Sequence, residues 1–474
     1  MTISADALEK LQSAIGKEWV LSSRIDLETY ASDGLPTHHA LPGAVAIPGT
    51  REELIAVVKI LFGFGIPFVA RGAGTGLSGG ALAGEDAVLI VLTRLNRVLE
   101  IDPANRRAVV EPGVVNVRLT EETEQFGLHF APDPASQSVC TIGGNVAENA
   151  GGPHCLKYGV TTDHILSIEA VLPDGEVVEL GTPGGEPWGP DLVSLFVGSE
   201  GAFGIATRIT VRLTPAPSFV RSVLAVFPSM RTAGNAVSNV IAAGVVPAAL
   251  EMMDKNCIAA VEASSYSAGY PKDAEAVLII ETDGLDEAAV EDDTKTVEDI
   301  LRSSGATNVQ TGSDPTQRAR LWQGRKKAFG AMGRISPDLM VQDAVVPRSV
   351  LPDILEHIGE IARKYDLSIC NVFHAGDGNL HPNINLDKRD AALVDRVEKA
   401  SAEIMRACIE VGGTITGEHG VGTEKLHLMP LVFDSTTLGV MRDVRRAFDP
   451  SELANPGKAI PEEPTTASAV SGGD

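Results

Sequence analysis

Short apolar runs separated by glycine-rich stretches dominate the chain from about residue 44 to residue 215. Runs of roughly four to eight apolar and β-branched residues are typical of strands. One amphipathic helix interrupts them at Thr50–Gly63, where Thr50 and Glu53 predict a capping box, and a shorter helix is expected at Ala5–Gly16. The predicted strands are 67–70, 87–92, 108–111, 165–172, 177–180 and 205–213.

After the break at Pro215-Ala216-Pro217, strands alternate with amphipathic helices, which indicates an α+β domain. Strands are predicted at 223–227, 277–281, 369–373 and 414–416, and helices at 230–243, 285–303 and 391–411, the last with Gly412 as C-cap. The expected organisation is a first domain at 1–217, a second domain at 218–411, a C-terminal segment at 412–460 and a disordered tail at 461–474.

Charge and cysteine usage exclude several classes of protein. The 474 residues carry 39 Lys and Arg against 63 Asp and Glu, a net charge of −24 that opposes binding to nucleic acid or anionic lipid. No apolar run approaches the ~20 residues of a membrane span, and the first residues lack a signal-peptide pattern. The five scattered cysteines argue against disulfides and iron–sulfur clusters. We therefore expect a cytoplasmic protein that is not an integral membrane protein.

The first glycine-rich loop, Gly72–Gly80, follows the strand predicted at 67–70. Residues 74–79 match the pattern G-x-G-x-x-G, but that dinucleotide fingerprint requires a helix directly after it. Here the chain continues into another predicted strand at Ala87, so a Rossmann site is disfavoured. A loop whose bare N–H groups cradle a pyrophosphate explains the glycines better, with a flexible turn as the alternative.

Two further loops share this composition. The segment Pro132–Gly159 is long, rich in Gly, Asn and Ser, and poor in aromatic residues, and Gly198-Ser199-Glu200-Gly201 precedes the strand that begins at Ile205. Long loops inside compact domains are usually functional. Three such loops in one domain predict an extended ligand such as a flavin dinucleotide.

Three motifs carry a family resemblance: Arg71-Gly72-Ala73-Gly74-Thr75, Thr141-Ile142-Gly143-Gly144-Asn145 and Gly198-Ser199-Glu200-Gly201. They resemble the FAD-binding domain of the vanillyl-alcohol oxidase/PCMH superfamily. From about Pro48 to Pro461 the chain is similar to the group formed by the FAD-linked subunit of glycolate oxidase, D-lactate dehydrogenase and D-2-hydroxyglutarate dehydrogenase. The resemblance implies an FAD-binding domain of two small α/β subdomains and an α+β cap, or substrate, domain with an antiparallel sheet.

The resemblance also implies which residues hold FAD. Many relatives attach FAD through a histidine where this chain has Thr75, so we expect non-covalent FAD, and His154 is interpreted as a polar loop residue rather than a flavin link. The implied cofactor residues are Arg71, Gly72, Ala73, Gly74, Thr75, Gly76, Leu77, Ser78, Pro132, Asp133, Ser136, Thr141, Gly143, Gly144, Asn145, Asn149, Gly151, Gly152, Tyr158, Gly159, Glu200, Gly201, Ile205 and Asn455.

A histidine and carboxylate cluster is the second candidate site. His374 and His381 flank the turn signal Gly376-Asp377-Gly378, and Gly417-Glu418-His419-Gly420 follows the strand predicted at 414–416. Residues seven apart on a straight strand point to opposite faces, but a turn can bring them together. Two histidines and one glutamate form a recognised ligand set for a divalent ion, although structural roles for the histidines remain the alternative.

The resemblance assigns roles within this cluster. It implies that His374, His381 and Glu418 bind a divalent metal, zinc or manganese, that His419 is the catalytic base, and that Asn379 orients the site. It also implies that Arg325 binds the substrate carboxylate, with Lys326 a weaker candidate and a solvated basic helix face the alternative. Phe329 and Val341 stand where the hydroxyglutarate enzyme has a threonine and a lysine, which favours a short monocarboxylate.

The sequence thus predicts an FAD- and metal-dependent dehydrogenase that oxidises glycolate or D-lactate and passes electrons to an acceptor other than NAD. By resemblance, partner flavin and iron–sulfur subunits take the electrons, and a homodimer is left open. D-2-hydroxyglutarate dehydrogenase and a non-catalytic FAD-binding subunit are the alternatives. A metal hydrolase without flavin fits the glycine-rich loops poorly, and alkyl-dihydroxyacetonephosphate-type chemistry gives no reason for the His and Glu cluster.

Overall fold

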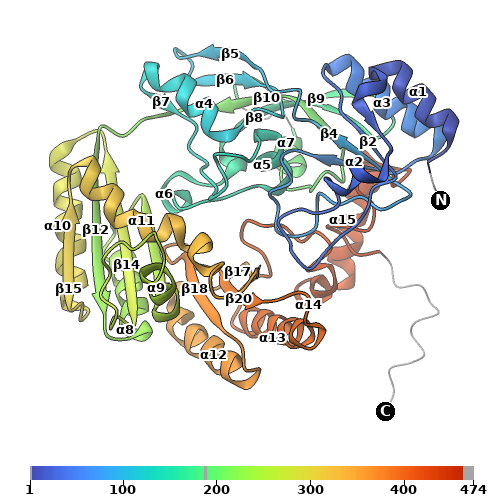
Figure 1. Cartoon of the computed structure of the whole chain (residues 1–474). Coiled ribbons are helices and arrows are strands. Elements are labelled where there is room, and N and C mark those ends of the chain that lie inside the picture. The colour runs from blue at the N-terminus through green and yellow to red at the C-terminus, as the bar shows by residue number, and fades with distance from the viewer. Residues whose placement is uncertain (1–2, 186–188, 463–474) are drawn as a thin grey trace.

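The computed structural model describes residues 3–185 and 189–462. Figure 1 shows the elements before β12 (Phe219–Phe227) as one lobe, the cap beside it, and the C-terminal helix α15 (Ser435–Phe448) returning to the first lobe. Nearly all of the tail predicted at 461–474 lies outside the described residues. No helix among the described residues is long and apolar enough to cross a bilayer.

The first sheet of the N-terminal lobe places the glycine-rich loop. Its strand order is β1 (Val20–Leu21), β2 (Ala44–Ala46), β4 (Val88–Val91) and β3 (Phe68–Arg71), and β2, β4 and β3 run parallel. The helices α1 (Ala5–Ile15) and α3 (Arg51–Phe64) pack on its core. Thr50 Oγ1 caps Glu53 N at 3.1 Å, but the Glu53 carboxylate accepts from Gly49 N, so the reciprocal half of the predicted capping box is not made.

The second sheet is antiparallel and lies beside the first. Its order is β5 (Val98–Asp102), β6 (Arg107–Val110), β10 (Ile205–Arg212), β8 (Ile165–Val171) and β9 (Val177–Gly181). Five shorter elements also belong to this lobe: α2 (Arg24–Glu28), α4 (Asn116–Thr123), α7 (Leu192–Phe196), and β7 (Leu128–His129) paired with β11 (Thr214–Pro215). The strands predicted for this lobe are therefore present within one or two residues of their expected ends.

The segment 132–159 is not all loop, so that part of the prediction was wrong. It contains the helices α5 (Ile142–Glu148) and α6 (Cys155–Tyr158). Thr141 Oγ1 accepts a hydrogen bond from Gly144 N, and this N-cap starts α5 although Gly143 and Gly144 have low helix propensity. Tertiary packing of Ile142 and Val146 into the core supplies the stability that the glycines do not.

The cap is an antiparallel sheet covered on both faces. Its central strands are β12 (Phe219–Phe227), β14 (Ala276–Gly284), β13 (Ala249–Asp254) and β18 (Ile369–His374). Alternate residues of β12 enter different cores: Val223 and Ala225 pack with α8 (Met230–Ala242), whereas Leu224 and Val226 pack with α9 (Lys255–Glu262). The outer strands are β15 (Asn308–Gly312), β16 (Asp338–Val341), β17 (Ala344–Val345), β19 (Asn379–Leu380) and β20 (Pro382–Leu386).

Four longer helices complete the cap. The helices α10 (Glu287–Ser303), α12 (Leu351–Lys364) and α13 (Ala391–Glu410) share the core of α8, and α11 (Pro315–Met332) shares that of α9. The observed sheets and helices confirm the predicted α+β class and the antiparallel cap sheet.

The C-terminal segment joins the two lobes. The strand predicted at 414–416 is absent: Thr414 makes an isolated bridge with Val345, and the following residues turn instead because their N–H groups bind the Asp343 carboxylate. After α14 (Met429–Val432) and α15, the chain returns to the edge of β3, where Phe68 N donates to Leu453 O at 2.8 Å and Asn455 N donates to Phe68 O at 2.8 Å.

Candidate active site

A cavity of about 410 Å³ lies between the two lobes. The loop after β3 and helix α5 line it from the N-terminal lobe, and the histidine and glutamate cluster lines it from the cap and the C-terminal segment. Its volume is typical of small-molecule and cofactor sites, which measure roughly 300–1,000 Å³. The two groups of residues singled out in the sequence therefore share one cavity.

The loop after β3 presents bare main chain to this cavity. No atom of the described residues accepts a hydrogen bond from the N–H groups of residues 72–77, although all six residues line the cavity. Successive unpaired N–H groups of this kind form a concave site for an anion. The loop thus fits the diphosphate of a dinucleotide, which supplies the missing acceptors.

Arg71 supports the loop from behind. Its guanidinium donates to Ser32 O at 2.9 Å and to Tyr30 O and Ala81 O at 3.4 Å. Gly74 has φ +71°, and a Cβ at that position would overlap the Arg71 guanidinium. Arg71 lines the cavity, but its hydrogen bonds hold the loop in shape.

Glycines also let the loop approach α5 closely. A Cβ on Gly72 would overlap Thr141 Oγ1, whereas a Cβ on Gly76 would meet no protein atom within 4 Å. At the far end of α5, a Cβ on Gly151 would come within 2.6 Å of Glu418 Oε2. The segment that follows α5 therefore lies against the cluster at the other end of the cavity.

The implied cofactor residues divide into two sets. Those that line the cavity are Arg71, Gly72, Ala73, Gly74, Thr75, Gly76, Leu77, Ser136, Thr141, Gly143, Gly144, Asn145, Gly151, Glu200, Gly201 and Ile205. Those that do not are Ser78, Pro132, Asp133, Asn149, Gly152, Tyr158, Gly159 and Asn455. Cavity-lining residues that sequence reasoning missed include Gly80, Ala135, Cys140 and Glu148, which are neighbours of the chosen motifs.

Several of the implied cofactor residues that do not line the cavity make structural contacts instead. Tyr158 Oη donates to Asp283 Oδ2 on β14 at 2.7 Å. His154 Nδ1 lies 2.6 Å from Asp133 Oδ2, its Nε2 lies 3.2 Å from Glu281 Oε1, and its ring stacks on Trp322. These contacts join the N-terminal lobe to the cap.

The structure brings His374, His381 and Glu418 together. His374 ends β18, His381 follows β19, and Glu418 lies in the turn after Thr414. Glu418 Oε1 is 3.1 Å from His381 Nε2 and 3.5 Å from His374 Nε2, and a ligand atom from each of the three lies within 4.8 Å of the others. This N, N, O donor set fits a divalent ion.

The outer nitrogen of each histidine has its own partner. His374 Nδ1 is 2.7 Å from Glu251 Oε1, and His381 Nδ1 is 3.2 Å from Gln342 O. Metal-binding histidines usually donate their other ring N–H in this way, which leaves the inner nitrogen free. The two Nε2 atoms are therefore oriented for a shared ion.

Glu251 links the cluster to Arg325. Its Oε2 accepts from Arg325 Nε at 2.6 Å, and both side chains are buried. Burial opposes ionisation of Glu251, but Arg325 and His374 outweigh it and hold its pKa below the usual value. No described residue accepts from the two Nη groups of Arg325, which lines the cavity, so its fork can bind a carboxylate.

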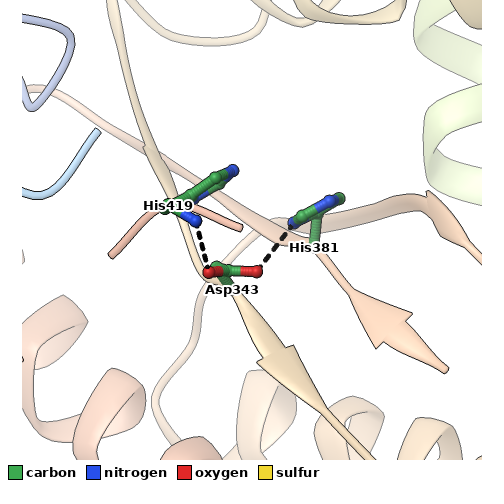
Figure 2. A group of neighbouring side chains, drawn as sticks. All are labelled: Asp343, His381 and His419. Carbon is green, nitrogen blue, oxygen red and sulfur yellow. Dashed lines mark hydrogen bonds and ion pairs between the residues drawn. The ribbon is translucent and has the colours of Figure 1, made fainter. Parts of the chain in front are cut away.

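His419 lies against His381 with the two rings parallel and 5.0 Å apart (Figure 2). Burial lowers the pKa of His419 to about 4, although Asp343 opposes that shift. The imidazole is therefore neutral near pH 7 and able to accept a proton. Figure 2 also shows Asp343 beneath both histidines.

Two implied catalytic residues lie away from the cavity. Lys326 is exposed, with its ammonium 5.9 Å from the centre of the Trp322 ring, and it does not line the cavity. Asn379 is buried, its amide lies where a Cβ on Gly417 would stand, and its Oδ1 has no hydrogen-bond partner among the described residues. The geometry therefore favours Arg325 over Lys326 as the contact for substrate.

Sequence reasoning missed Glu251 and Asp343. Each is a single acid inside an apolar run, Ala248–Met253 and Leu339–Val346, and each is almost completely buried. Carboxylates are rarely buried unless they are paired, so an isolated acid in an apolar strand was an available signal.

Comparisons with known proteins agree with this architecture. Residues 42–181 match the FAD binding domain family, and residues 216–459 match the family of FAD linked oxidases, C-terminal domain. The chain is 46% identical over 442 residues to glycolate oxidase subunit GlcD of Escherichia coli strain K12, covering 93% of this chain and 88% of that one. It is 31% identical over 464 residues to D-lactate dehydrogenase of Anaerostipes hadrus, covering 96% and 97%.

The fold has solved counterparts as well. The crystal structure of p-cresol methylhydroxylase with substrate bound superposes with a TM-score of 0.80 over 96% of each chain at 19% identity. At this identity the match concerns the fold. The family matches and the two relatives confirm the predicted resemblance: the chain belongs to the FAD-linked oxidoreductases, in the group of the glycolate oxidase GlcD proteins and the D-lactate dehydrogenases.

Proposed function

We propose that this FAD-linked oxidoreductase requires a divalent metal and oxidises a small D-2-hydroxy acid, glycolate or D-lactate, to the 2-oxo acid. One observation carries the proposal. A single cavity joins a main-chain anion cradle to a cluster of His374, His381, Glu418 and His419, with the open fork of Arg325 beside it. A hydrolase would have no use for the cradle, and a passive FAD carrier would have no use for the cluster.

Each residue has a role in this chemistry. The N–H groups of residues 72–77 hold the FAD diphosphate, and FAD supplies the hydride acceptor. His374, His381 and Glu418 would hold the metal, which would supply a Lewis acid for the substrate oxygen atoms. Arg325 binds the carboxylate and fixes the orientation of Cα, and neutral His419 accepts the hydroxyl proton as the hydride leaves.

The cavity favours a substrate with one carboxylate. Arg71 and Arg325 are the Lys or Arg side chains among the described residues that line it, and Arg71 is engaged by three carbonyl groups. Phe329, one helical turn after Arg325 on α11, and Val341 at the end of β16 also line the cavity and offer no polar group. A second carboxylate, as in D-2-hydroxyglutarate, would be buried without a partner, which is costly.

The electrons then pass to an acceptor other than NAD. A relative named glycolate oxidase subunit is by its name part of a larger assembly, which supports partner subunits that accept the electrons. All five cysteines are free thiols in the structure. We propose that the protein is cytoplasmic and that another chain carries the iron–sulfur cluster that accepts the electrons. Thr75 offers no ring nitrogen for a covalent link, so we propose non-covalent FAD.

Anaerobic bleaching of the flavin band tests the proposal. Purified FAD-loaded protein is mixed with D-lactate, L-lactate, glycolate, D-2-hydroxyglutarate or D-malate. We expect rapid bleaching by D-lactate or glycolate and none by L-lactate, because Arg325 and His419 fix one orientation of Cα. Faster bleaching by D-2-hydroxyglutarate would overturn the substrate assignment alone. A yellow protein that none of the acids bleaches would support a non-catalytic subunit.

A further inference from the structure

Asp343 has no role in the chemistry above, yet it accepts a hydrogen bond from each of residues 416–419, the turn that carries Glu418 and His419. Its Oδ2 accepts from the N–H groups of Gly417 at 2.9 Å, Glu418 at 3.2 Å and His419 at 2.9 Å. It also accepts from Thr416 Oγ1 at 2.6 Å. Three successive N–H groups that converge on one oxygen form an anion-binding concavity, filled here by a carboxylate of the same chain.

This contact determines where the turn points its side chains. With the N–H groups of residues 417–419 directed toward Asp343, Glu418 and His419 face the cavity. Thr416 Oγ1 also accepts from Gly420 N at 3.0 Å, so the turn is closed on itself as well as anchored. Apart from the bridge at Thr414, the turn has no strand pairing among the described residues that could hold it instead.

A buried lysine balances the charge of this anchor. Lys425 Nζ lies 3.4 Å from Asp343 Oδ2 and 3.4 Å from Asp343 O, and both side chains are almost completely buried. Removing one member of such a pair leaves an uncompensated charge in the interior. Loss of the pair and loss of the turn's anchor are therefore separable, because substitution of Lys425 leaves the four donors on Oδ2 in place.

Asp343 also lies near enough to His381 and His419 to form a second group with metal-binding atoms. Two contacts argue against that use. The Oδ2 atom already has five donors, Lys425 Nζ among them, and His381 Nδ1, which is 3.9 Å from Oδ1, is directed at Gln342 O at 3.2 Å. The group is also inaccessible, since Asp343 has no exposed surface.

We propose that Asp343 is a positioning residue that presents Glu418 to the metal and His419 to the substrate through the N–H groups of the turn. This inference rests on the proposed function for its catalytic consequence, but the positioning of the turn can be measured without it. The test compares Asp343→Asn with the matched control Lys425→Met and with the double variant, all in the full-length chain.

Two measurements distinguish loss of the turn's positioning from a general loss of stability. Hydrogen–deuterium exchange of the peptide that contains residues 416–420 should rise at least about tenfold in Asp343→Asn and stay near the parent value in Lys425→Met. Affinity for Mn²⁺, measured by competition with a chelating dye in the absence of substrate, should fall about 10- to 100-fold in Asp343→Asn, the usual effect of removing support from a ligand. Lys425→Met should keep that affinity within about threefold while melting at a lower temperature.

The double variant keeps the test informative if a single variant folds poorly. Because it removes both charges, it should recover part of the melting temperature lost in the single variants, but not the Mn²⁺ affinity. Equal exchange and equal affinity in Asp343→Asn and Lys425→Met would overturn the positioning role. So would a parent protein that binds two Mn²⁺ and loses one in Asp343→Asn, which would make Asp343 a ligand. If the parent binds no metal but Asp343→Asn still raises exchange of the turn, the proposed function fails and the anchor stands.

Discussion

The two ends of the cavity are built in opposite ways. At one end, residues 72–77 present main-chain N–H groups, and glycine keeps side chains out of the way. At the other end, His374, His381 and Glu418 present side chains, and each is held by a second polar group. The shape of the first end depends on the absence of side chains, and that of the second on a network of charged and polar groups.

This difference predicts different responses to substitution. Adding a single methyl group should damage the main-chain end, because its function is close approach. The side-chain end should respond instead to loss of charge, since its ligands depend on Glu251 and Asp343, which come from other parts of the sequence.

His419→Gln should abolish most of the reaction at the side-chain end and leave the main-chain end intact. A positioned base contributes about 10²- to 10⁴-fold to rate, so the rate of flavin reduction should fall by that factor. FAD content and Mn²⁺ binding should remain normal, because His419 is not one of the three proposed ligands. Stopped-flow reduction by D-lactate or glycolate measures the rate, and a variant as fast as the parent would remove His419 from the mechanism.

The single substitution Glu251→Gln should weaken the binding of both the metal and the substrate. It keeps the shape of the side chain but removes the charge shared by His374 and Arg325. We expect Mn²⁺ affinity to fall about 10- to 100-fold, as for other residues that support a ligand, together with a rise in KM. Loss of metal affinity with an unchanged KM would show that Arg325 binds no substrate carboxylate.

Gly74→Ala and Gly76→Ala form a matched pair at the main-chain end. Gly74 has φ +71° and no room for a Cβ, so alanine there should cost about 1–3 kcal/mol of stability and reduce FAD content. Gly76 has room on the protein side, and its methyl group would enter the cavity. The second variant should therefore melt like the parent without FAD but bind FAD more weakly. Equal FAD affinity in Gly76→Ala and the parent would exclude this part of the loop from the FAD site.

His154→Gln should give the smallest effect, on stability rather than on chemistry. Burial lowers the pKa of His154, but Asp133 and Glu281 outweigh it and hold that pKa well above 6.5. The folded state therefore binds this proton more tightly than the unfolded state, so the stabilisation is complete below about pH 6.5 and is lost as pH rises through the raised pKa. The denaturant midpoints of the variant and the parent should differ more at pH 6 than at pH 9, and a constant difference would contradict the charged bridge.

The main-chain end was the easier one to predict from sequence. The residues of a glycine-rich loop are contiguous in sequence, so the motif itself shows which residues belong to it. The loop at 72–77 lines the cavity as expected. Helix α5 was missed because Thr141 and core packing override the low propensity of its glycines. The family resemblance implied that Tyr158 and Asp133, in the second loop, bind FAD, but their partners are on the cap or at His154.

At the side-chain end, the sequence predicted the three proposed metal ligands but not the residues that support them. The motifs around His374, His381 and Glu418 are visible as residue types, and the turn at Gly376–Gly378 brings the two histidines together. Glu251 and Asp343 escaped notice because the residues they bind are more than 70 positions away in sequence, a relation that no local pattern contains. The residues that support a ligand are thus brought to it by the tertiary fold.

We propose that a metal bound at the side-chain end of the cavity is required for reduction of the flavin bound at the main-chain end. Stopped-flow reduction of the flavin by D-lactate or glycolate, in protein stripped of metal by a chelator and then reloaded with Mn²⁺, tests it directly. The stripped protein should keep its FAD spectrum, because the cradle at 72–77 needs no metal, but its reduction should slow at least about 100-fold and recover on reloading. An equal rate in stripped and reloaded protein, at equal FAD content, would contradict the account.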